Sequence, residues 1–297
     1  MNKKRVGLIL FVLLMLFMIF FPIIMAQYAK KSIVDENTDD TPCLSYVDEK
    51  YGPDFKIKVL NHGTNKVEEI DFEKYICGVV HAEMPASFEM EALKAQAVAA
   101  RTYCLYRIEK HTVTHKDSDV CTDPAHCNAY KPIENATSQV QSRIITAVYG
   151  TRGKVVTYKG KLIDALYHSS SHQRTENAYN VWGNDVPYLR SVETPEEGRV
   201  NAIKIKCKDV FSTLSIPASV YASADIGSSF TTYLNNTGRV DKISFFGVKY
   251  SGTKFRGSFG ILSTKFTIEH DGDSFIITSY GYGHGVGMSQ YGANEFA

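Results

Sequence analysis

Residues 88–110 read FEMEALKAQAVAARTYCLYRIEK and hold the clearest folding signal in the chain. This stretch has neither Gly nor Pro, is rich in Ala, and follows Pro85 and Ser87 with acidic residues near its start, a pattern that predicts an α-helix. Its apolar residues recur every three or four positions and mark one buried face: Leu93, Ala97, Ala100, Cys104 and Ile108. A long helix with one buried face indicates a folded domain built around it.

The rest of the chain places helices early and strands late. Residues 55–60 and 66–70 alternate polar and apolar side chains around a turn, which predicts a β-hairpin, and Asp71 is expected to cap a short helix after it. A further helix is expected over residues 138–148. Alternating or β-branched stretches then predict strands: 154–158, 161–167, 242–250, 265–270 and 274–280. The sequence thus indicates an α+β fold with a helical core and antiparallel β-sheets.

The N-terminus carries a membrane-type segment. Residues 1–5 are a basic tail, and residues 6–26 are apolar without any charge. About 20 apolar residues cross a bilayer and basic flanks stay in the cytoplasm, so this stretch predicts a transmembrane helix with the rest of the chain outside. A signal peptide cleaved after Ala26 is the alternative, although Ile24 fits a small-residue cleavage site poorly. The polar residues 27–53 are expected to form a stalk.

The charge outside that segment is nearly balanced. Three of the 33 Lys and Arg residues lie before residue 6, which leaves 30 against 32 Asp and Glu residues. Binding to nucleic acid calls for a strong basic excess, so this balance argues against nucleic acid as a partner. The chain is rich in Tyr, and aromatic rings suit sugars because their faces cover C–H groups while a hydroxyl donates hydrogen bonds.

The first candidate for chemistry is Glu83, in the bend HAEMP at residues 81–85. A carboxyl group partly buried against apolar neighbours has a raised pKa and can stay protonated near neutral pH, as a general acid must. The positive end of the helix that follows favours the opposite, charged form. The alternative is a structural role, in which Glu83 caps a helix or pairs with a base.

Glycines occupy every second position at the start of GYGHGVGM, residues 281–288. In a strand this leaves one face bare, so that a ligand or another backbone can approach closely, and it puts Tyr282 and His284 on the other face. Under the functional interpretation the strand lines a substrate groove, with both residues binding substrate. The alternative is tight packing of a neighbouring element on the glycine face, with His284 satisfied in the core.

Four zinc-type ligands lie within 13 residues of one another in the sequence. His115, Cys121, His126 and Cys127 match a tetrahedral zinc site in number and type, and a closed site with four protein ligands would be structural. The adjacent ligands at 126 and 127 are unusual for the standard spacings. The alternative is a Cys121–Cys127 disulfide, which an extracytoplasmic location would allow.

A polar stretch, YHSSSHQRTE at residues 167–176, follows a predicted strand. Ser170 and Arg174 are candidates for binding sugar hydroxyl and N-acetyl groups. The alternative is a solvated loop with ordinary turn hydrogen bonds. His168 and His172 flank the serines, but nothing in the spacing supports a Ser–His–acid nucleophile.

A set of motifs extends over roughly residues 50–297. These are AEMPAS (82–87), EALKAQAVAARTY (91–103), YHSSS (167–171), RTE (174–176), VWG (181–183), PYL (187–189) and GYGHGVGMSQYGA (281–293). Together and in this order they resemble the family of stage II sporulation protein D, whose fold is shared by enhancers of a cell-wall amidase.

The resemblance implies a lytic transglycosylase of endospore formers. Such an enzyme cuts MurNAc–GlcNAc strands of peptidoglycan, stripped of stem peptides, to 1,6-anhydroMurNAc products during engulfment. It acts in the space between mother cell and forespore, together with stage II sporulation proteins P and M. A glycan-binding activator of an amidase, without catalysis, is the alternative.

The resemblance also implies a catalytic residue and the boundaries of the domain. The family's catalytic glutamate is the one in Glu-Met-Pro, hence Glu83, and a zinc-binding loop occurs in some members. An extracytoplasmic domain at 54–297 is implied, with a β-rich subdomain inserted at about 192–275. Two departures stand out: His172 and Gln173 replace a Gly-Gly pair, and the helix expected after Ala293 is cut short.

Overall fold

The computed structural model describes residues 42–47, 51, 52, 54–110, 115, 117–222 and 225–297. The basic tail, the predicted anchor at 6–26 and most of the predicted stalk lie outside these described residues. Within the described ranges the fold is α+β with several antiparallel sheets, as the sequence predicted.

The fold class is corrected on one point, the transmembrane helix. No helix among the described residues is both long and apolar enough to cross a membrane. The longest of them, α3 (Met90–Lys110), has 21 residues but carries charged side chains along its length, Glu91 and Arg101 among them. Charged side chains at such positions are costly in hydrocarbon, so its length alone does not make it a spanning segment.

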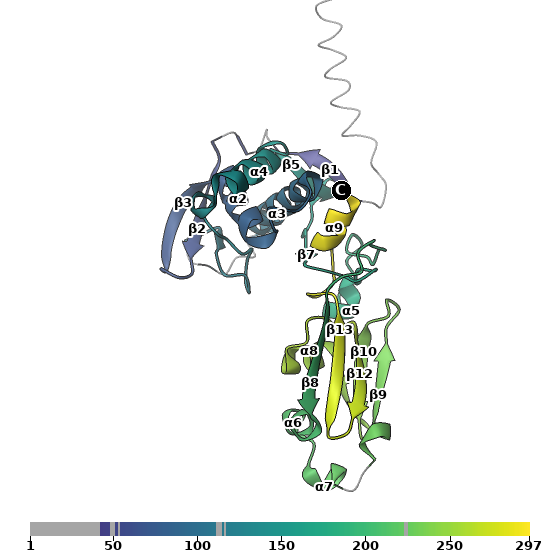
Figure 1. Ribbon diagram of the computed structural model, residues 1–297. Helices are drawn as coiled ribbons and strands as arrows, with labels where there is room; N and C mark the ends of the chain where they lie inside the picture. Colours follow the sequence, from purple (N-terminus) through teal and green to yellow (C-terminus); the bar gives the residue numbers. More distant parts are fainter. Residues whose placement is uncertain (1–41, 48–50, 53, 111–114, 116, 223–224) are drawn as a thin grey trace, which may run out of the picture.

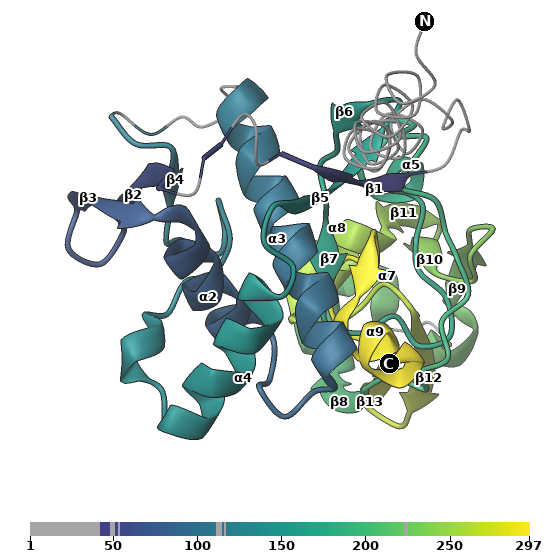
Figure 2. The same cartoon turned by 90° about the horizontal axis from the view of Figure 1, so that it is seen from above.

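Three helices and a hairpin form the first part of the fold (Figure 1). Strands β2 (Lys56–Asn61) and β3 (Lys66–Asp71) pair as the predicted hairpin, and the short β4 (Val120–Cys121) joins β2 in parallel. Asp71 then caps α2 (Phe72–Glu83) by accepting the N–H of Lys74 at 2.9 Å, as predicted. The helices α3 and α4 (Ser138–Tyr149) pack beside α2, and η1 (Ile133–Asn135) precedes α4. Seen from above, α3 runs through the middle of this part (Figure 2).

A buried ion pair ties these helices together. Arg101 on α3 is fully buried and donates to both carboxylate oxygens of Glu73 on α2, at 2.9 and 2.7 Å. Its guanidinium also donates to the backbone carbonyls of Lys154 and Val148, at 3.1 Å each. A buried charge needs this degree of pairing, since an unpaired one is strongly destabilising.

Short strands complete the first part and connect it to the second. One sheet is built from β1 (Cys43–Tyr46), β5 (Lys154–Tyr158) and β6 (Lys161–Leu162). A parallel pair joins β7 (Tyr167–His168) to β14 (Met288–Ser289), which leads into α9 (Gln290–Phe296). The helix α9 rests against α3, where Gln290 donates to Gln96 at 3.2 Å. The predicted strand over 161–167 is thus broken into two short pieces.

The second part is rich in strands and has its own hydrophobic cluster, with Phe211, Phe245 and Phe275 at its centre. One sheet has the order β12 (Phe266–Asp271), β13 (Ser274–Tyr280), β8 (Val200–Lys206); the other has the order β11 (Val248–Ser251), β10 (Val240–Phe245), β9 (Phe230–Leu234). The helices here are α6 (Cys207–Thr213), α7 (Ala218–Tyr221), η2 (Ile226–Ser228) and α8 (Gly252–Phe259). This part lies below the helical one in Figure 1, with α5 (Ala178–Trp182) and α9 between them. The predicted limits of an inserted subdomain stay a prediction.

Candidate functional site

Glu83 is the last residue of α2, where the helix ends in the buried Met84. Its Oε1 accepts a hydrogen bond of 2.7 Å from the backbone N–H of Ala129, and its side chain is partly buried. Burial raises the pKa of Glu83 above its usual range, while the Ala129 N–H and the hydroxyl of Tyr167 act in the opposite direction. The position therefore favours a carboxyl group that holds its proton, as a general acid must.

Tyr167 on β7 is the side chain that faces Glu83. Its hydroxyl donates to Oδ1 of Asn128 at 2.9 Å and also lies against the Glu83 carboxyl group. Burial holds the pKa of Tyr167 well above the ordinary value, so the phenol stays neutral. The phenol has one proton for two neighbours, and it can therefore donate to Asn128 while accepting the proton of a neutral Glu83.

The residue before Tyr167 faces a different space. Leu166 lines a hollow of about 850 Å³ together with Ala95 and Val98 of α3 and with Tyr188. Glu83 is not among the residues that line it, so this hollow is separate from the candidate catalytic group.

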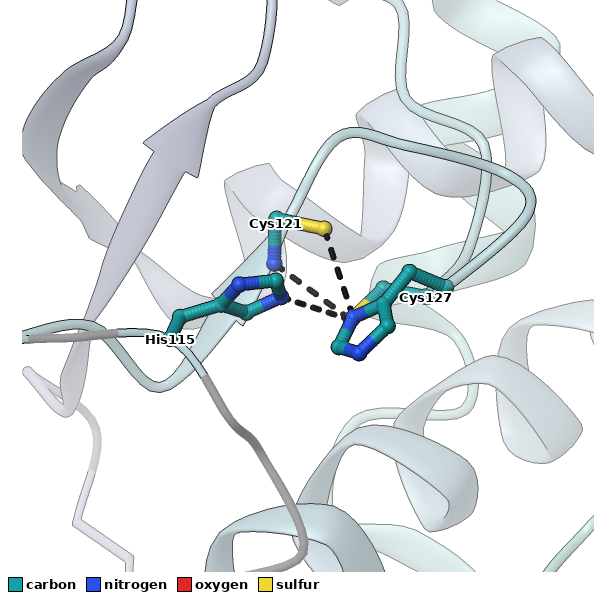
Figure 3. Close-up of side chains that lie close together, drawn as sticks. His115, Cys121 and Cys127 are labelled. Atoms are coloured by element: carbon teal, nitrogen blue, oxygen red, sulfur yellow. Dashed lines mark hydrogen bonds between the residues drawn. The ribbon is translucent and has the colours of Figure 1, made fainter.

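The four predicted zinc ligands come together. The ligand atoms of His115, Cys121, His126 and Cys127 all lie within 4.8 Å of one another. Figure 3 shows the side chains of His115, Cys121 and Cys127 converging on one point. The Nδ1 of His126 lies 3.8 Å from the sulfur of Cys121 and 3.6 Å from that of Cys127.

This spacing fits a tetrahedral ion. With Zn–S and Zn–N bonds of roughly 2.3 and 2.0–2.1 Å, neighbouring ligand atoms at a zinc ion stand about 3.6 Å apart. The donor set of two thiolates and two imidazoles is also one that zinc prefers. The alternative of a disulfide is not what the structure contains, because all six cysteines, Cys121 and Cys127 included, are free.

The glycine segment is not a regular strand. Gly281, Gly283, Gly285 and Gly287 all have positive φ, and only isolated bridges join Tyr282 to Ser170 and Val286 to Glu176 before β14 begins. A Cβ on Gly281 would lie 2.5 Å from the carbonyl oxygen of Ser170. The bare glycine positions thus admit the neighbouring backbone, which is the packing alternative raised by the sequence.

His284 is held by the protein itself. Its Nδ1 accepts the N–H of Val286 at 3.1 Å, and the ring also hydrogen-bonds the backbone carbonyl of Tyr167, which makes Nε2 the protonated nitrogen. Burial and the nearby Arg256 lower the pKa of His284 to about 4, so the ring is neutral. Both ring nitrogens are hydrogen-bonded within the protein.

The remaining predicted binding residues lie in two places. Ser170 and Tyr282 exchange backbone hydrogen bonds at 3.0 and 2.7 Å, and the Ser170 hydroxyl is buried without a hydrogen-bond partner in the described structure. Arg174 instead forms an ion pair with Glu193 at 2.7 Å and reaches Ser191 at 3.5 Å. The structure thus joins Ser170 to the glycine segment and places Arg174 apart from it.

The two residues that replace the expected glycines keep a glycine-like backbone. His172 and Gln173 have φ of 57° and 72°, in the left-handed region that costs other residues about 1–2 kcal/mol each. The backbone here therefore takes a conformation that glycine would adopt without this cost.

Sequence reasoning gave no role to Tyr167, Asn128 and Ala129. Tyr167 was visible as part of the YHSSS motif, and Asn128 directly follows the last cysteine of the cluster. Ala129 contributes only its backbone N–H, for which no side-chain pattern exists. Proximity to a recognised motif was the one signal that could have pointed to the other two.

The structure thus brings a half-buried carboxyl group and the hydroxyl of Tyr167 together in a two-part α+β fold, and comparisons with known proteins identify the family. Residues 60–158 match the family model SpoIID, described as stage II sporulation protein. The chain belongs to the stage II sporulation protein D family.

Individual relatives support this membership. Stage II sporulation protein D of Bacillus subtilis (strain 168) is 34% identical over 251 residues, which cover 81% of this chain and 73% of that protein. Stage II sporulation protein D of Bacillus amyloliquefaciens is 33% identical over 252 residues, or 81% and 72% of the two chains. An amidase enhancer of Bacillus subtilis (strain 168) is 31% identical over an alignment of 327 positions, and the alignment covers 83% of this chain and 44% of that protein.

Proposed function

We propose that this protein is a lytic transglycosylase that cuts the glycan strands of peptidoglycan, with Glu83 as its acid and base. The observation that carries the proposal is the environment of Glu83, whose partial burial raises its pKa while the Ala129 N–H fixes one carboxyl oxygen. A neutral carboxyl group held in place can deliver its proton to a glycosidic oxygen.

One carboxyl group is enough for this reaction. Glycoside hydrolases position two, the second serving as nucleophile or activating water. In a lytic transglycosylase the C6 hydroxyl of the sugar attacks C1 while the C1–O bond to the leaving sugar breaks. Glu83 gives its proton to the leaving oxygen and then takes the proton of the C6 hydroxyl, which closes a 1,6-anhydro ring without consuming water.

The other buried carboxylates of this region are engaged in structure. Glu176 accepts hydrogen bonds from Thr237 and Asn235, at 2.9 and 2.8 Å. Glu196 accepts from the backbone of Ser171 and from the hydroxyl of Ser289, at 2.7 and 2.6 Å. These contacts support a mechanism that depends on Glu83 alone.

The rest of the assignment follows the same proposal. Arg174 and Tyr282, whose side chains are partly exposed, would contact the sugar hydroxyl and N-acetyl groups, and the buried Ser170 would hold Tyr282 through their backbone hydrogen bonds. A structural zinc ion would be held by the cluster of His115, Cys121, His126 and Cys127, and it would fix the loop that leads to Ala129. The ion's part would be to hold this loop, since the four protein ligands leave no open position for substrate.

The setting of the reaction is also proposed. Peptidoglycan lies outside the cytoplasm, so a domain at 54–297 with an inserted part at about 192–275 would act between mother cell and forespore during engulfment. Stage II sporulation proteins P and M would be its partners, and P would supply strands without stem peptides. If neither protein co-purified with this one from sporulating cells, the result would count against this setting.

The test is digestion of purified strands stripped of stem peptides. The wild-type protein is expected to release products with 1,6-anhydroMurNAc ends, identified by mass spectrometry, whereas Glu83→Gln should release none and remain folded. Glu89→Gln, at an exposed position before α3, is the matched control and should keep full activity. Reducing ends in place of anhydro ends would indicate a hydrolase.

The amidase enhancer among the relatives supports a second candidate, an activator that binds glycan without cutting it. In that case no glycan product forms with any variant. Stimulation of an amidase by the purified protein would then be the same for the wild type and for Glu83→Gln.

A further inference from the structure

Trp182 is the one tryptophan of the chain, and 48% of its surface is exposed. It is the last residue of α5, which ends in Gly183 with φ of 78°. The N–H of Gly183 donates to the carbonyl of Tyr179 at 2.8 Å and closes the helix. A large aromatic side chain is thus presented to solvent from a backbone that is held in place.

The start of α5 is held as firmly as its end. Glu176 accepts hydrogen bonds from the N–H of Asn177 and from the side chain of Asn180, at 2.7 and 2.8 Å. The N–H of Ala178 donates to the carbonyl of Leu189 at 3.1 Å. The short helix is therefore fixed by a buried carboxylate and does not depend on its own length for stability.

One side of the Trp182 ring rests on His284. The ring centroids are 5.3 Å apart with an angle of 54° between the planes. His284 in turn lies 5.7 Å from His168, again at a tilted angle. The three rings form a series that begins at the surface and ends at a buried histidine.

Both histidines are held by the backbone of the same residue, Val286. The N–H of Val286 donates to Nδ1 of His284 at 3.1 Å, and its carbonyl is hydrogen-bonded to Nδ1 of His168 at 3.1 Å. The Nε2 of His168 is bonded to the hydroxyl of Ser171. Since neither imidazole has a nitrogen to spare, the pair serves as a support that orients Trp182.

This support reaches Glu83 through a single residue. His284 hydrogen-bonds the backbone carbonyl of Tyr167, and the hydroxyl of Tyr167 lies against the Glu83 carboxyl group. Trp182 is therefore two contacts away from Tyr167 and three from the acid. An unbroken series of contacts thus connects the exposed indole face to the proposed catalytic group.

We propose that the open side of Trp182 binds an N-acetylhexosamine ring of the strand, near the bond that Glu83 protonates, and that His284 acts as a positioning residue for it. An indole face covers the apolar C–H side of a sugar ring and loses little conformational entropy in doing so. The inference rests on the proposed function, because the ligand is the glycan strand itself.

The first measurement uses Trp182 as its own reporter. Since the chain has one tryptophan, fluorescence excited selectively over that of the tyrosines comes from this residue alone. Strands without stem peptides are titrated into full-length Glu83→Gln, which cannot cut them. A saturable change in emission is expected, at the concentrations at which strands co-sediment with the protein.

The second measurement is kinetic. Trp182→Ala is expected to raise KM for the strands about tenfold, the effect of losing one good aromatic contact, with a smaller change in kcat. Trp182→Phe keeps a ring and should recover most of the affinity. Tyr233→Ala removes a comparably exposed aromatic residue on β9 and should leave KM unchanged.

The outcomes separate this inference from the proposed function. If the wild type cuts strands while the emission of Trp182 stays constant and Trp182→Ala keeps the wild-type KM, the sugar site is wrong and the enzyme stands. If no strand is cut by any variant but the emission still changes on binding, the sugar site stands and the catalytic proposal fails. Should Trp182→Ala unfold, the emission titration decides alone.

Discussion

The backbone N–H of Ala129 donates a hydrogen bond of 2.7 Å to Oε1 of Glu83, and Ala129 stands two residues after Cys127. The intervening Asn128 accepts from the hydroxyl of Tyr167, the other neighbour of Glu83. The loop that carries the His and Cys side chains therefore continues directly into Ala129, which bonds the proposed acid, and Asn128, which bonds its neighbour Tyr167. A ligand that ordered this loop would also order the carboxyl group.

We expect zinc removal to reduce both stability and activity for this reason. The purified protein should contain about one zinc ion per chain by elemental analysis. Cys121→Ser should lower zinc affinity more than about tenfold, since the loss of a ligand exceeds the effect of a neighbouring hydrogen bond. A chelator should lower Tm and glycan cleavage together, and added zinc should restore both.

Cys207→Ser is the matched control, because Cys207 lies in the second hydrophobic cluster and should keep the metal. The zinc assignment would be wrong if the active protein contained no metal and peptide mapping without reductant showed Cys121 joined to Cys127.

The local elements of the fold were predictable because their signals are periodic. The long helix, the hairpin before α2 and the Asp71 cap all follow from side-chain alternation or from one capping oxygen. The glycine segment misled the prediction, since alternation of Gly with larger residues also describes a strand. What decides its shape is the positive φ at Gly281 and its successors, a backbone property that composition does not show.

The candidate site was predictable in part for a similar reason. Glu83 and the His and Cys ligands are chemically distinctive side chains, and the structure places the ligands together. The partners of Glu83 come from Ala129 and Tyr167, which are 46 and 84 residues further along the chain. Such a contact depends on the tertiary fold, and a backbone N–H looks the same at every position.

Glu83→Gln should stabilise the protein at high pH even though it abolishes cleavage. Because burial raises the pKa of Glu83 in the folded state, the folded protein binds this proton more tightly than the unfolded chain does. The free energy of unfolding of the wild type should therefore fall as pH rises from the unfolded pKa through the folded one. The loss is about 1.4 kcal/mol for each unit of pKa difference.

Urea unfolding at pH 4 and pH 8 measures this effect. The difference between Glu83→Gln and wild type should favour the variant more at the higher pH. If the free energy of unfolding of Glu83→Gln relative to the wild type were the same at both pH values, Glu83 would not be desolvated in the folded protein.

Gln173→Gly should stabilise the protein slightly. Gln173 has φ of 72° and an exposed side chain, and its backbone hydrogen-bonds that of Glu196 and Thr194. Glycine removes the free-energy cost of the left-handed conformation in the folded state. It also raises the conformational entropy of the unfolded chain, which offsets part of that stabilisation. We expect a net gain of up to about 1 kcal/mol in the free energy of unfolding, whereas Gln141→Gly within α4 should lose more than about 1 kcal/mol, because it also removes the side-chain hydrogen bond to the carbonyl of Ala136.

Gly281→Ala should be far more damaging than its backbone angle alone explains. Gly281 has φ of 81°, and an added Cβ would stand 2.5 Å from the Ser170 carbonyl oxygen, which is too close for the bridge to Tyr282 to survive. Gly160 has φ of 71° with nothing within 4 Å of an added Cβ, so Gly160→Ala isolates the cost of the angle, about 1–2 kcal/mol. Denaturant unfolding of both variants gives the difference, and a clash that forces the backbone to shift should add about 1–3 kcal/mol at Gly281. Equal losses at the two positions would mean that the segment can move away from Ser170 without cost, and the support that it gives to His284 would then be loose as well.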